Sequence, residues 1–326
     1  MRRQLNGDRI WYNRNFHIEP SNICTHRCRF CSYRRDDAAQ PGAWSMELEK
    51  IRPYCEEKYE PGMTEIHIVG SVQPDRKLDY YAGILREVRR FADGHATEAR
   101  PITIKAYTAV EIDDMCRFGG ITPEECLRLL QEAGLETMPG GGAEIFAPHV
   151  RRQVCPDKAT AERWLDIHRT AHRLGIPTNC TMLFGHVDSR EDRVDHLLAL
   201  RALQAETGGF NAFIPLKFKA RGNALSQLGE ISEEEVLRTF AIARLALDNI
   251  PHIKAYWPML GKDLAFEAMA WGADDLDGTI NDSTRIYSLA GAADQRPVLT
   301  VDELRQRAAA TGWTAVERDS FYHLLS

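Results

Sequence analysis

Short apolar segments rich in β-branched and aromatic residues alternate with longer amphipathic segments along nearly the whole chain. This alternation is typical of parallel strands joined by helices, because two parallel neighbours need a long crossover connection. We predict eight strands, at residues 15–20, 65–72, 102–109, 135–140, 178–185, 210–218, 252–260 and 274–280. Together with the helical segments between them, these strands predict a closed (β/α)8 barrel of the TIM type.

A doubly wound open sheet is the alternative α/β architecture. It is not favoured, because no G-x-G-x-x-G follows the first strand and the alternation has no obvious break. The chain of 326 residues also has no long polar linker or low-complexity segment. We therefore predict one domain over residues 1–326, with a barrel core at about 15–311. The polar-aromatic tail 312–326 is predicted to cover one end of the barrel.

Two helices carry clear start signals in the sequence. Ser232 lies three residues before Glu235, and Thr300 lies three residues before Glu303, so each pair predicts a capping box. Asp274, Asp275 and Asp277 lack the remaining ligands of a calcium loop, and are predicted to cap the last strand or to line the barrel mouth.

Composition and charge exclude several classes of partner. The net charge of -6 leaves no basic footprint for nucleic acid. No apolar run reaches the ~18 residues that a membrane span needs, so no membrane partner is expected. The first 15 residues are too polar for the core of a signal peptide, which predicts a cytoplasmic location.

Three of the eight cysteines, Cys24, Cys28 and Cys31, lie within eight positions directly after the first predicted strand. The other five are scattered singly and are predicted to be small buried residues. A structural zinc needs four protein ligands, and no second C-x-x-C occurs. An iron–sulfur cubane can accept three cysteines and leave one iron open to a ligand. A zinc or electron-carrier site that recruits a distant cysteine remains the alternative.

The spacing C-x3-C-x2-C, with Phe30 before the last cysteine, resembles the signature of radical S-adenosylmethionine (SAM) enzymes. This resemblance implies that Cys24, Cys28 and Cys31 hold a 4Fe–4S cluster whose open iron binds SAM. One electron would then split SAM into methionine and a 5'-deoxyadenosyl radical. An electron donor such as flavodoxin or ferredoxin is also implied. The remaining SAM contacts implied by the resemblance are Tyr33, Gly70, Ser71, Thr108, Gly141, Glu144 and Met182.

Some of these residues also have plainer interpretations. Tyr33 could simply pack, and Gly70 could serve only as a turn at the end of a strand. The glycine triplet 140–142 allows backbone to approach a ligand closely, and it lacks the lysine of a phosphate loop.

Longer segments resemble the aminofutalosine synthase family of menaquinone biosynthesis over nearly the whole chain. These are IKAYTAVEI, PGGGAEIF, TMLFGH, GGFNAFIPL, NIPHIKAYWPMLG and GADDLDGTI. The resemblance implies addition of the adenosyl radical to 3-[(1-carboxyvinyl)oxy]benzoate, giving aminofutalosine, bicarbonate and methionine. Dehypoxanthine futalosine cyclase and the second subunit of deazaflavin (FO) synthase are related alternatives that abstract hydrogen. A non-enzymatic iron–sulfur or zinc protein is the alternative from another class.

An enol-ether substrate with two carboxylates needs cations and hydrogen-bond donors at the strand ends. Lys105, Tyr107, His186 and Lys254 are the predicted substrate contacts, and His186 and Lys254 are also the candidate catalytic residues. The chain departs from the family pattern at three places, which bear on substrate choice and leave radical generation untouched. They involve Ser71 and Gln73 after the second strand, Lys217 at the sixth, and Thr284 and Ser288 after the eighth.

Overall fold

The computed structural model describes residues 1–278, 280–281, 285–289 and 297–325. Within them, parallel strands follow one another around a barrel in chain order. They are β2 (Asn15–Ile18), β3 (Glu65–Ile68), β4 (Thr103–Ala106), β5 (Thr178–Phe184), β6 (Phe210–Lys217), β7 (His252–Ile253) and β8 (Asp275–Gly278). Residues 137–138 stand between β4 and β5 through two single parallel bridges, and a third bridge joins Lys254 to Asp275.

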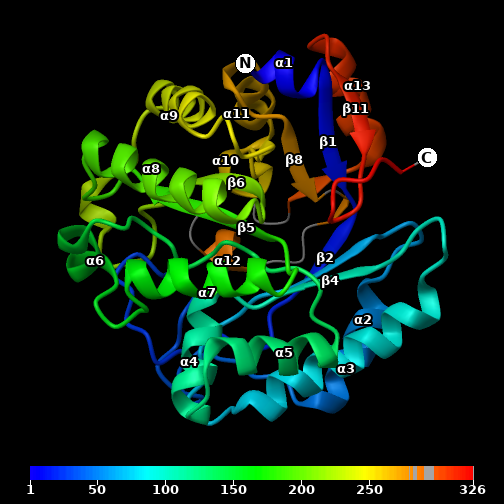
Figure 1. The fold of residues 1–326 in the computed structure, drawn as a ribbon, viewed down its shortest axis with the longest axis vertical. Helices are drawn as coiled ribbons and strands as arrows, with labels where there is room; N and C mark the ends of the chain where they lie inside the picture. Colours follow the sequence, from blue (N-terminus) through cyan, green and yellow to red (C-terminus); the bar gives the residue numbers. More distant parts are fainter. Residues whose placement is uncertain (279, 282–284, 290–296, 326) are drawn as a thin grey trace.

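The barrel closes through the first strand, which is longer than predicted. β1 (Arg9–Asn13) runs almost directly into β2, and it pairs in parallel with β8 while β2 pairs with β3. β1 also pairs on its other side with β11 (Thr314–Glu317), so this N-terminal strand lies between two strands from the C-terminal part of the chain (Figure 1). Seven of the eight predicted positions carry strands, and 135–140 contributes only single bridges. The predicted strand 252–260 is wrong in its second half, because the strand ends at Ile253 and residues 257–260 form a short helix. The closed barrel is confirmed over the doubly wound sheet.

Helices surround the strands, as Figure 1 shows. The longer ones are α2 (Leu48–Lys58), α3 (Leu78–His95), α4 (Ala109–Gly119), α5 (Pro123–Ala133), α7 (Ala161–Arg173), α8 (Arg190–Thr207), α9 (Glu233–Ala246) and α13 (Val301–Ala310). The shorter ones are α1 (Arg2–Asn6), α6 (Pro148–Val154), α10 (Trp257–Leu260), α11 (Lys262–Glu267) and α12 (Ile286–Leu289). β9 (Ile280–Asn281) and β10 (Val298–Leu299) form a small antiparallel pair. No helix in the described ranges is both long and apolar enough to cross a bilayer.

The helix starts follow the sequence signals only in part. Ser232 and Thr300 each accept the backbone N–H of the residue three positions later, as predicted. The second hydrogen bond of a capping box, from the N-cap backbone N–H to the glutamate side chain, is replaced by ion pairs. Glu235 pairs with Arg190 and Arg193. Glu303 pairs with Lys262 and Arg307. Basic side chains of neighbouring helices, and Arg307 of the same helix, thus compete for these carboxylates.

The C-terminal tail lies against the amino ends of barrel strands, opposite the predicted mouth. Arg318 is fully buried, and its Nε donates to Asp275 Oδ2 at 2.5 Å. Ser320 Oγ donates to Glu65 Oε2 at 2.6 Å, and Asn211 Nδ2 donates to the Ser320 carbonyl at 3.3 Å. Since Glu65, Asn211 and Asp275 all lie at or next to the beginning of their strands, the tail closes the base of the barrel. The division into one domain with a core at about 15–311 stays a prediction.

Candidate active site

The cysteine loop follows β2 and is fastened to several elements of the barrel mouth. The Thr25 N–H donates to the Val72 carbonyl after β3 at 2.9 Å, and the Arg29 N–H donates to the Val154 carbonyl at the end of α6 at 2.9 Å. On the other side, the Ala224 N–H donates to the Arg29 carbonyl at 2.9 Å. The loop is therefore held in place by backbone contacts from both halves of the chain.

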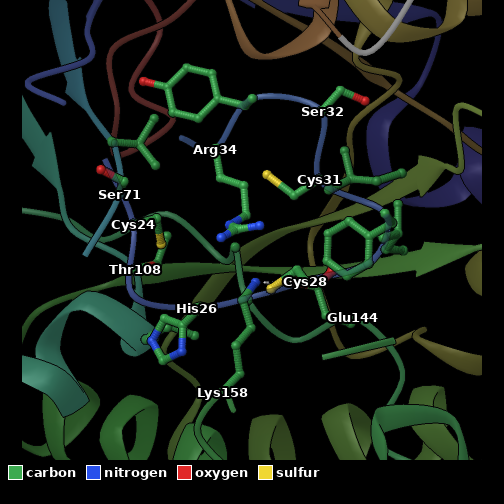
Figure 2. A pocket seen from close by; sticks show the side chains of 18 of the residues that line it. Cys24, His26, Cys28, Cys31, Ser32, Arg34, Ser71, Thr108, Glu144 and Lys158 are labelled. Carbon is green, nitrogen blue, oxygen red and sulfur yellow. Dashed lines mark hydrogen bonds and ion pairs between the residues drawn. The ribbon is translucent and has the colours of Figure 1, made fainter. Parts of the chain in front are cut away.

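The thiols of Cys24, Cys28 and Cys31 face one cavity of about 260 Å³. Figure 2 shows their sulfur atoms at separate points around this space, with Arg34 reaching in between them. All three cysteines are free. Burial raises the pKa of Cys24 and Cys28, so binding of a metal there must displace the thiol protons.

This arrangement suits a cluster better than a single ion. Among the residues that the structure describes, no group of three or more His, Cys, Asp or Glu side chains is close enough to hold one metal ion. Three thiols spread around a cavity match the donor set of a cubane with one open iron.

The exit of β3 contributes predicted SAM contacts to the cavity wall. Gly70 and Ser71 both line it. The Ser71 hydroxyl lies 2.9 Å from the Ser21 carbonyl and 2.7 Å from the Ile23 carbonyl, so this side chain fastens the cysteine loop to the strand. Tyr33 also lines the cavity, and its hydroxyl donates to the Ser21 carbonyl at 3.1 Å. Ser71, one of the departures from the family pattern, thus has a structural role.

The glycine triplet packs tightly against protein as well as facing the cavity. A Cβ at Gly140 would lie 2.5 Å from the Cys180 Cα, because this segment runs against the backbone of β5. Gly141 lines the cavity, and a Cβ there would lie 2.9 Å from the Thr108 Cγ2. Gly142 has φ of +87° and would meet Val110 at 2.4 Å. All three glycines are needed for close approach to neighbouring atoms. Gly141 lines this cavity and also a second cavity, which is described below.

Two acidic residues lie on the cavity wall. Glu144 forms an ion pair with Lys158, with 2.6 Å between Oε1 and Nζ, and both residues line the cavity. Glu111 accepts the Thr108 N–H at 2.7 Å and the Gly70 N–H at 3.3 Å, so it joins the starts of two mouth segments. Burial raises the pKa of Glu111.

The loop that carries Glu144 is held by a buried neutral histidine on α8. His196 Nε2 lies 2.9 Å from the Thr181 carbonyl, and His196 Nδ1 lies 3.2 Å from the Phe146 backbone nitrogen. A carbonyl can only accept and a backbone N–H can only donate, so Nε2 carries the proton and Nδ1 accepts. Burial lowers the pKa of His196 to about 3.

We expect this histidine to make the protein acid-sensitive. The unfolded chain takes up a proton near the usual histidine pKa of about 6.5, whereas folded His196 stays neutral. The contribution of neutral His196 to the free energy of unfolding is therefore complete above pH 6.5 and falls as the pH drops toward 3. Between pH 7.5 and 5, His196→Gln should lose about 2 kcal/mol less unfolding free energy than the wild type. Urea unfolding at both pH values measures the difference, and equal losses in the two proteins would contradict this assignment.

A second cavity of about 100 Å³ lies next to the first one. Val69, Thr108, Gly141 and Leu216 line both cavities, which therefore share a wall. The remaining lining of the second cavity comes from His17, His67, Lys105, Pro139, Gly140, Asn179, Thr181, Ile214, Lys254, Tyr256 and Asp277. These residues lie on or directly after the strands, in the interior of the barrel.

The two predicted substrate lysines are already paired in this interior. Lys105 Nζ lies 2.5 Å from Glu65 Oε2, and Lys254 Nζ lies 2.5 Å from Asp277 Oδ1. Burial favours the protonated form of both carboxyl groups. The positive charges of Lys105 and Lys254 outweigh this effect and lower the pKa of Glu65 and Asp277. Burial lowers the pKa of Lys105. Both lysines line the second cavity with a carboxylate partner in place.

Three predicted site residues line neither cavity. Tyr107 has φ of +56° and donates its hydroxyl to the Tyr81 carbonyl of α3 at 2.7 Å, so it points into the helix layer. Met182 is fully buried on β5 between Thr181 and Leu183, which do line the cavities, and strand alternation turns it outward. The His186 side chain is buried, with its Nδ1 2.7 Å from the Val187 backbone nitrogen. Burial lowers the pKa of His186.

The other departures from the family pattern have local partners. Gln73 Oε1 accepts the Ser45 hydroxyl at 2.9 Å. Lys217 and Lys219 both line the first cavity and share Glu230, at 2.9 and 3.4 Å. Ser288 Oγ donates to the Arg285 carbonyl at 3.1 Å. Thr284 lies outside the described residues.

Sequence reasoning missed several residues of the cavity wall. His26 lies inside the cysteine motif and pairs with Asp114 of α4, with Nε2 and Oδ2 2.5 Å apart. Burial lowers the pKa of His26 to about 4. The position of His26 in the motif could have marked it, and the Thr108–Glu111 spacing could have marked Glu111 as a cap. Lys158 carries no such signal, because only the fold brings it to the cysteines.

The fold and the cysteine loop together are those of a radical SAM enzyme, and comparisons with known proteins agree. A model of the radical SAM superfamily matches residues 18–200, and a model of the CofH/MqnC C-terminal region matches residues 207–325. The chain belongs to the radical SAM superfamily, whose members use a 4Fe–4S cluster and SAM.

Similar proteins of known name identify the family of this chain within the radical SAM superfamily. Aminodeoxyfutalosine synthase from Thermus thermophilus is 41% identical, covering 99% of this chain and 85% of that protein. The Streptomyces coelicolor enzyme of the same name is 36% identical, covering 100% and 84%. The predicted resemblance to this family is confirmed. A 5-amino-6-(D-ribitylamino)uracil–L-tyrosine 4-hydroxyphenyl transferase from Methanopyrus kandleri is also 36% identical, covering 98% and 86%.

Solved structures agree on the fold. Methylornithine synthase superposes with a TM-score of 0.74 at 14% identity, covering 96% of this chain and 86% of that one. The FeFe-hydrogenase maturase HydG from Carboxydothermus hydrogenoformans gives 0.72 at 18% identity, covering 98% and 71%. At these identities the likeness concerns the barrel alone.

Proposed function

We propose that this enzyme catalyses the aminodeoxyfutalosine synthase reaction of menaquinone biosynthesis. In it, the adenosyl group of SAM adds to the enol-ether double bond of 3-[(1-carboxyvinyl)oxy]benzoate. With water, the products are 6-amino-6-deoxyfutalosine, methionine and bicarbonate. The observation that carries the proposal is the full-length match to synthases of this name at 41% and 36% identity, on a chain with three thiols at the barrel mouth.

The first cavity is the proposed place of the cluster and SAM. Cys24, Cys28 and Cys31 would hold three irons and leave the fourth open. Such a cluster supplies the electron that splits SAM into methionine and the 5'-deoxyadenosyl radical. Gly70, Ser71, Tyr33, Thr108, Gly141 and Glu144 stay proposed SAM contacts, since all six line this cavity. Met182 does not line it.

The second cavity is the proposed place of the enol ether. Because it shares Val69, Thr108, Gly141 and Leu216 with the first cavity, a substrate there would lie next to the adenosyl group. The apolar side chains on the shared wall help to exclude water, which a reactive radical requires. Tyr107 and His186 line neither cavity, so they are no longer proposed to touch the substrate.

The substrate carboxylates need positive charge that is not already neutralised. Lys105 and Lys254 remain proposed polar contacts, although each faces a buried carboxylate. Lys217 and Lys219 share the single carboxylate of Glu230, so this part of the first cavity has one positive charge in excess. Lys217 and Lys219 are therefore candidate partners of a carboxylate bound in the first cavity. No side chain is assigned a proton-transfer role.

An anaerobic incubation tests the proposed reaction. Reconstituted protein is mixed with dithionite, SAM and 3-[(1-carboxyvinyl)oxy]benzoate, and the nucleoside products are separated by liquid chromatography with mass detection. We expect methionine and 6-amino-6-deoxyfutalosine in equal amounts. Free 5'-deoxyadenosine as the only nucleoside product would contradict the addition reaction. Flavodoxin or ferredoxin as the natural donor, and a cytoplasmic location, stay predictions.

The archaeal relatives support a second candidate reaction. Their name specifies L-tyrosine and 5-amino-6-(D-ribitylamino)uracil, and the Methanopyrus kandleri protein is as similar to this chain as the Streptomyces coelicolor synthase. A parallel incubation with these two compounds decides between the candidates. A 4-hydroxyphenyl transfer product in it, with no product from the enol ether, would replace the synthase assignment.

A further inference from the structure

Lys158 places a positive charge beside the cysteine loop from a distant part of the chain. It belongs to the segment between α6 and α7, and its side chain is only 15% exposed. Figure 2 shows the side chain rising toward Cys28 on the floor of the cavity. The structure therefore puts an ammonium group where the proposed function puts a cluster.

The position of this lysine brings its charge to the proposed cluster ligands. Lys158 lines the same cavity as Cys24, Cys28 and Cys31. A lysine side chain ordinarily carries a positive charge at neutral pH, and in a protein interior such a charge acts through space with little screening. The charge of Lys158 thus acts on a cluster held in this cavity.

One carboxylate opposes this charge. Glu144 Oε1 lies 2.6 Å from Lys158 Nζ, and the ring of Phe30 lies 5.3 Å from the same nitrogen. Phe30 comes from the cysteine motif itself, so the lysine packs directly on the cluster loop. Glu144 and Lys158 form a buried pair in which either charge can be removed separately.

Reduction of an iron–sulfur cluster adds one negative charge. A buried cation favours the reduced state and a buried carboxylate disfavours it, because net charge near the cluster sets its reduction potential. We propose that Lys158 tunes the reduction potential of the cluster upward, with Glu144 moderating the effect. Lys158 is thus a tuning residue, which acts through the cluster and not on the substrate. This inference rests on the cluster site of the proposed function.

Redox titration of the reconstituted holoenzyme, without SAM or substrate, tests the inference. The reduced cluster is followed by electron paramagnetic resonance, and iron is counted in every sample. In Lys158→Met, the ratio of reduced to oxidised cluster at a given potential should fall about tenfold, which is about 59 mV for one electron. In Glu144→Gln the ratio should rise by a similar factor. Lys158→Arg keeps the charge and should stay near the wild type.

The double variant Lys158→Met/Glu144→Gln separates electrostatics from structural damage. Removing both charges should bring the potential back toward the wild type, whereas damage to the site would add up in the double variant. An unchanged potential in Lys158→Met with full iron content overturns the inference. If Lys158→Met does not retain iron, the absence of an upward shift in Glu144→Gln overturns it. A wild-type protein that binds no cluster would instead overturn the proposed function.

Discussion

Alanine at Cys28 is expected to abolish both cluster binding and SAM cleavage. Cys28 is buried against the loop and supplies one of three sulfurs around the cavity, and no other side chain in the described residues completes a metal-binding group there. Iron content should fall from about four per chain to near zero, and the visible absorption of the cluster should disappear. Cys24→Ala and Cys31→Ala should behave in the same way. Iron analysis and methionine release under dithionite measure the two effects.

Cys55→Ala is the matched control for this experiment. Cys55 is also buried, but it lies on α2 and does not line the cavity. Its loss removes one small side chain from the core, which costs about 1 kcal/mol and leaves iron content unchanged. Full iron content together with SAM cleavage in any one of the three loop variants would contradict the ligand assignment.

Leucine at Arg318 is expected to destabilise the protein by about 3–5 kcal/mol, because it leaves a buried carboxylate without its cation. Arg318 is fully buried at the base of the barrel and pairs with Asp275 at 2.5 Å. Burial favours the protonated form of Asp275, but the positive charge of Arg318 outweighs this effect and lowers the pKa of Asp275. The guanidinium also lies 4.2 Å from the centre of the Tyr322 ring, so the substitution removes a cation–π contact within the tail as well. Urea unfolding followed by circular dichroism measures the loss.

Arg307→Leu is the control for charge removal at the surface. Arg307 pairs with Asp263 and Glu303 on exposed helices, and such pairs are worth about 0–1 kcal/mol. The double variant Arg318→Leu/Asp275→Asn should be less destabilised than the sum of its single variants, since the unpaired charge is gone. A loss below about 1 kcal/mol in Arg318→Leu would show that the tail does not hold the barrel base.

The fold was largely predictable, because short apolar strand segments and longer amphipathic helical segments can each be recognised from neighbouring residues in the chain. Each predicted strand position carries barrel strand or bridge residues, since buried parallel strands read as short apolar runs. The first half of the first strand, Arg9–Asn13, was missed because it is flanked by charged and amide residues. Its pairing with both β8 and β11 depends on chain segments more than 250 residues away.

The candidate site also has features that the sequence predicts and features that it does not. The cysteine motif could be recognised because all three thiols fall within eight residues and must share one loop. Tyr107 and Met182 line neither cavity, because the direction of a side chain depends on strand register and on a positive φ, which spacing does not reveal. Lys105 and Lys254 did reach the barrel interior, but their partners Glu65 and Asp277 come from other strands.

The sequence by itself determined the alternation of strands and helices and the grouping of the three thiols, because both are patterns among near neighbours in the chain. Tertiary structure alone decided what surrounds those thiols. It brings Lys158 to Cys28 across about 130 residues, joins two cavities through a shared wall, and closes the barrel base with Arg318. Charge and burial act through space, so their effects on the cluster and on the substrate become visible only once the chain is folded.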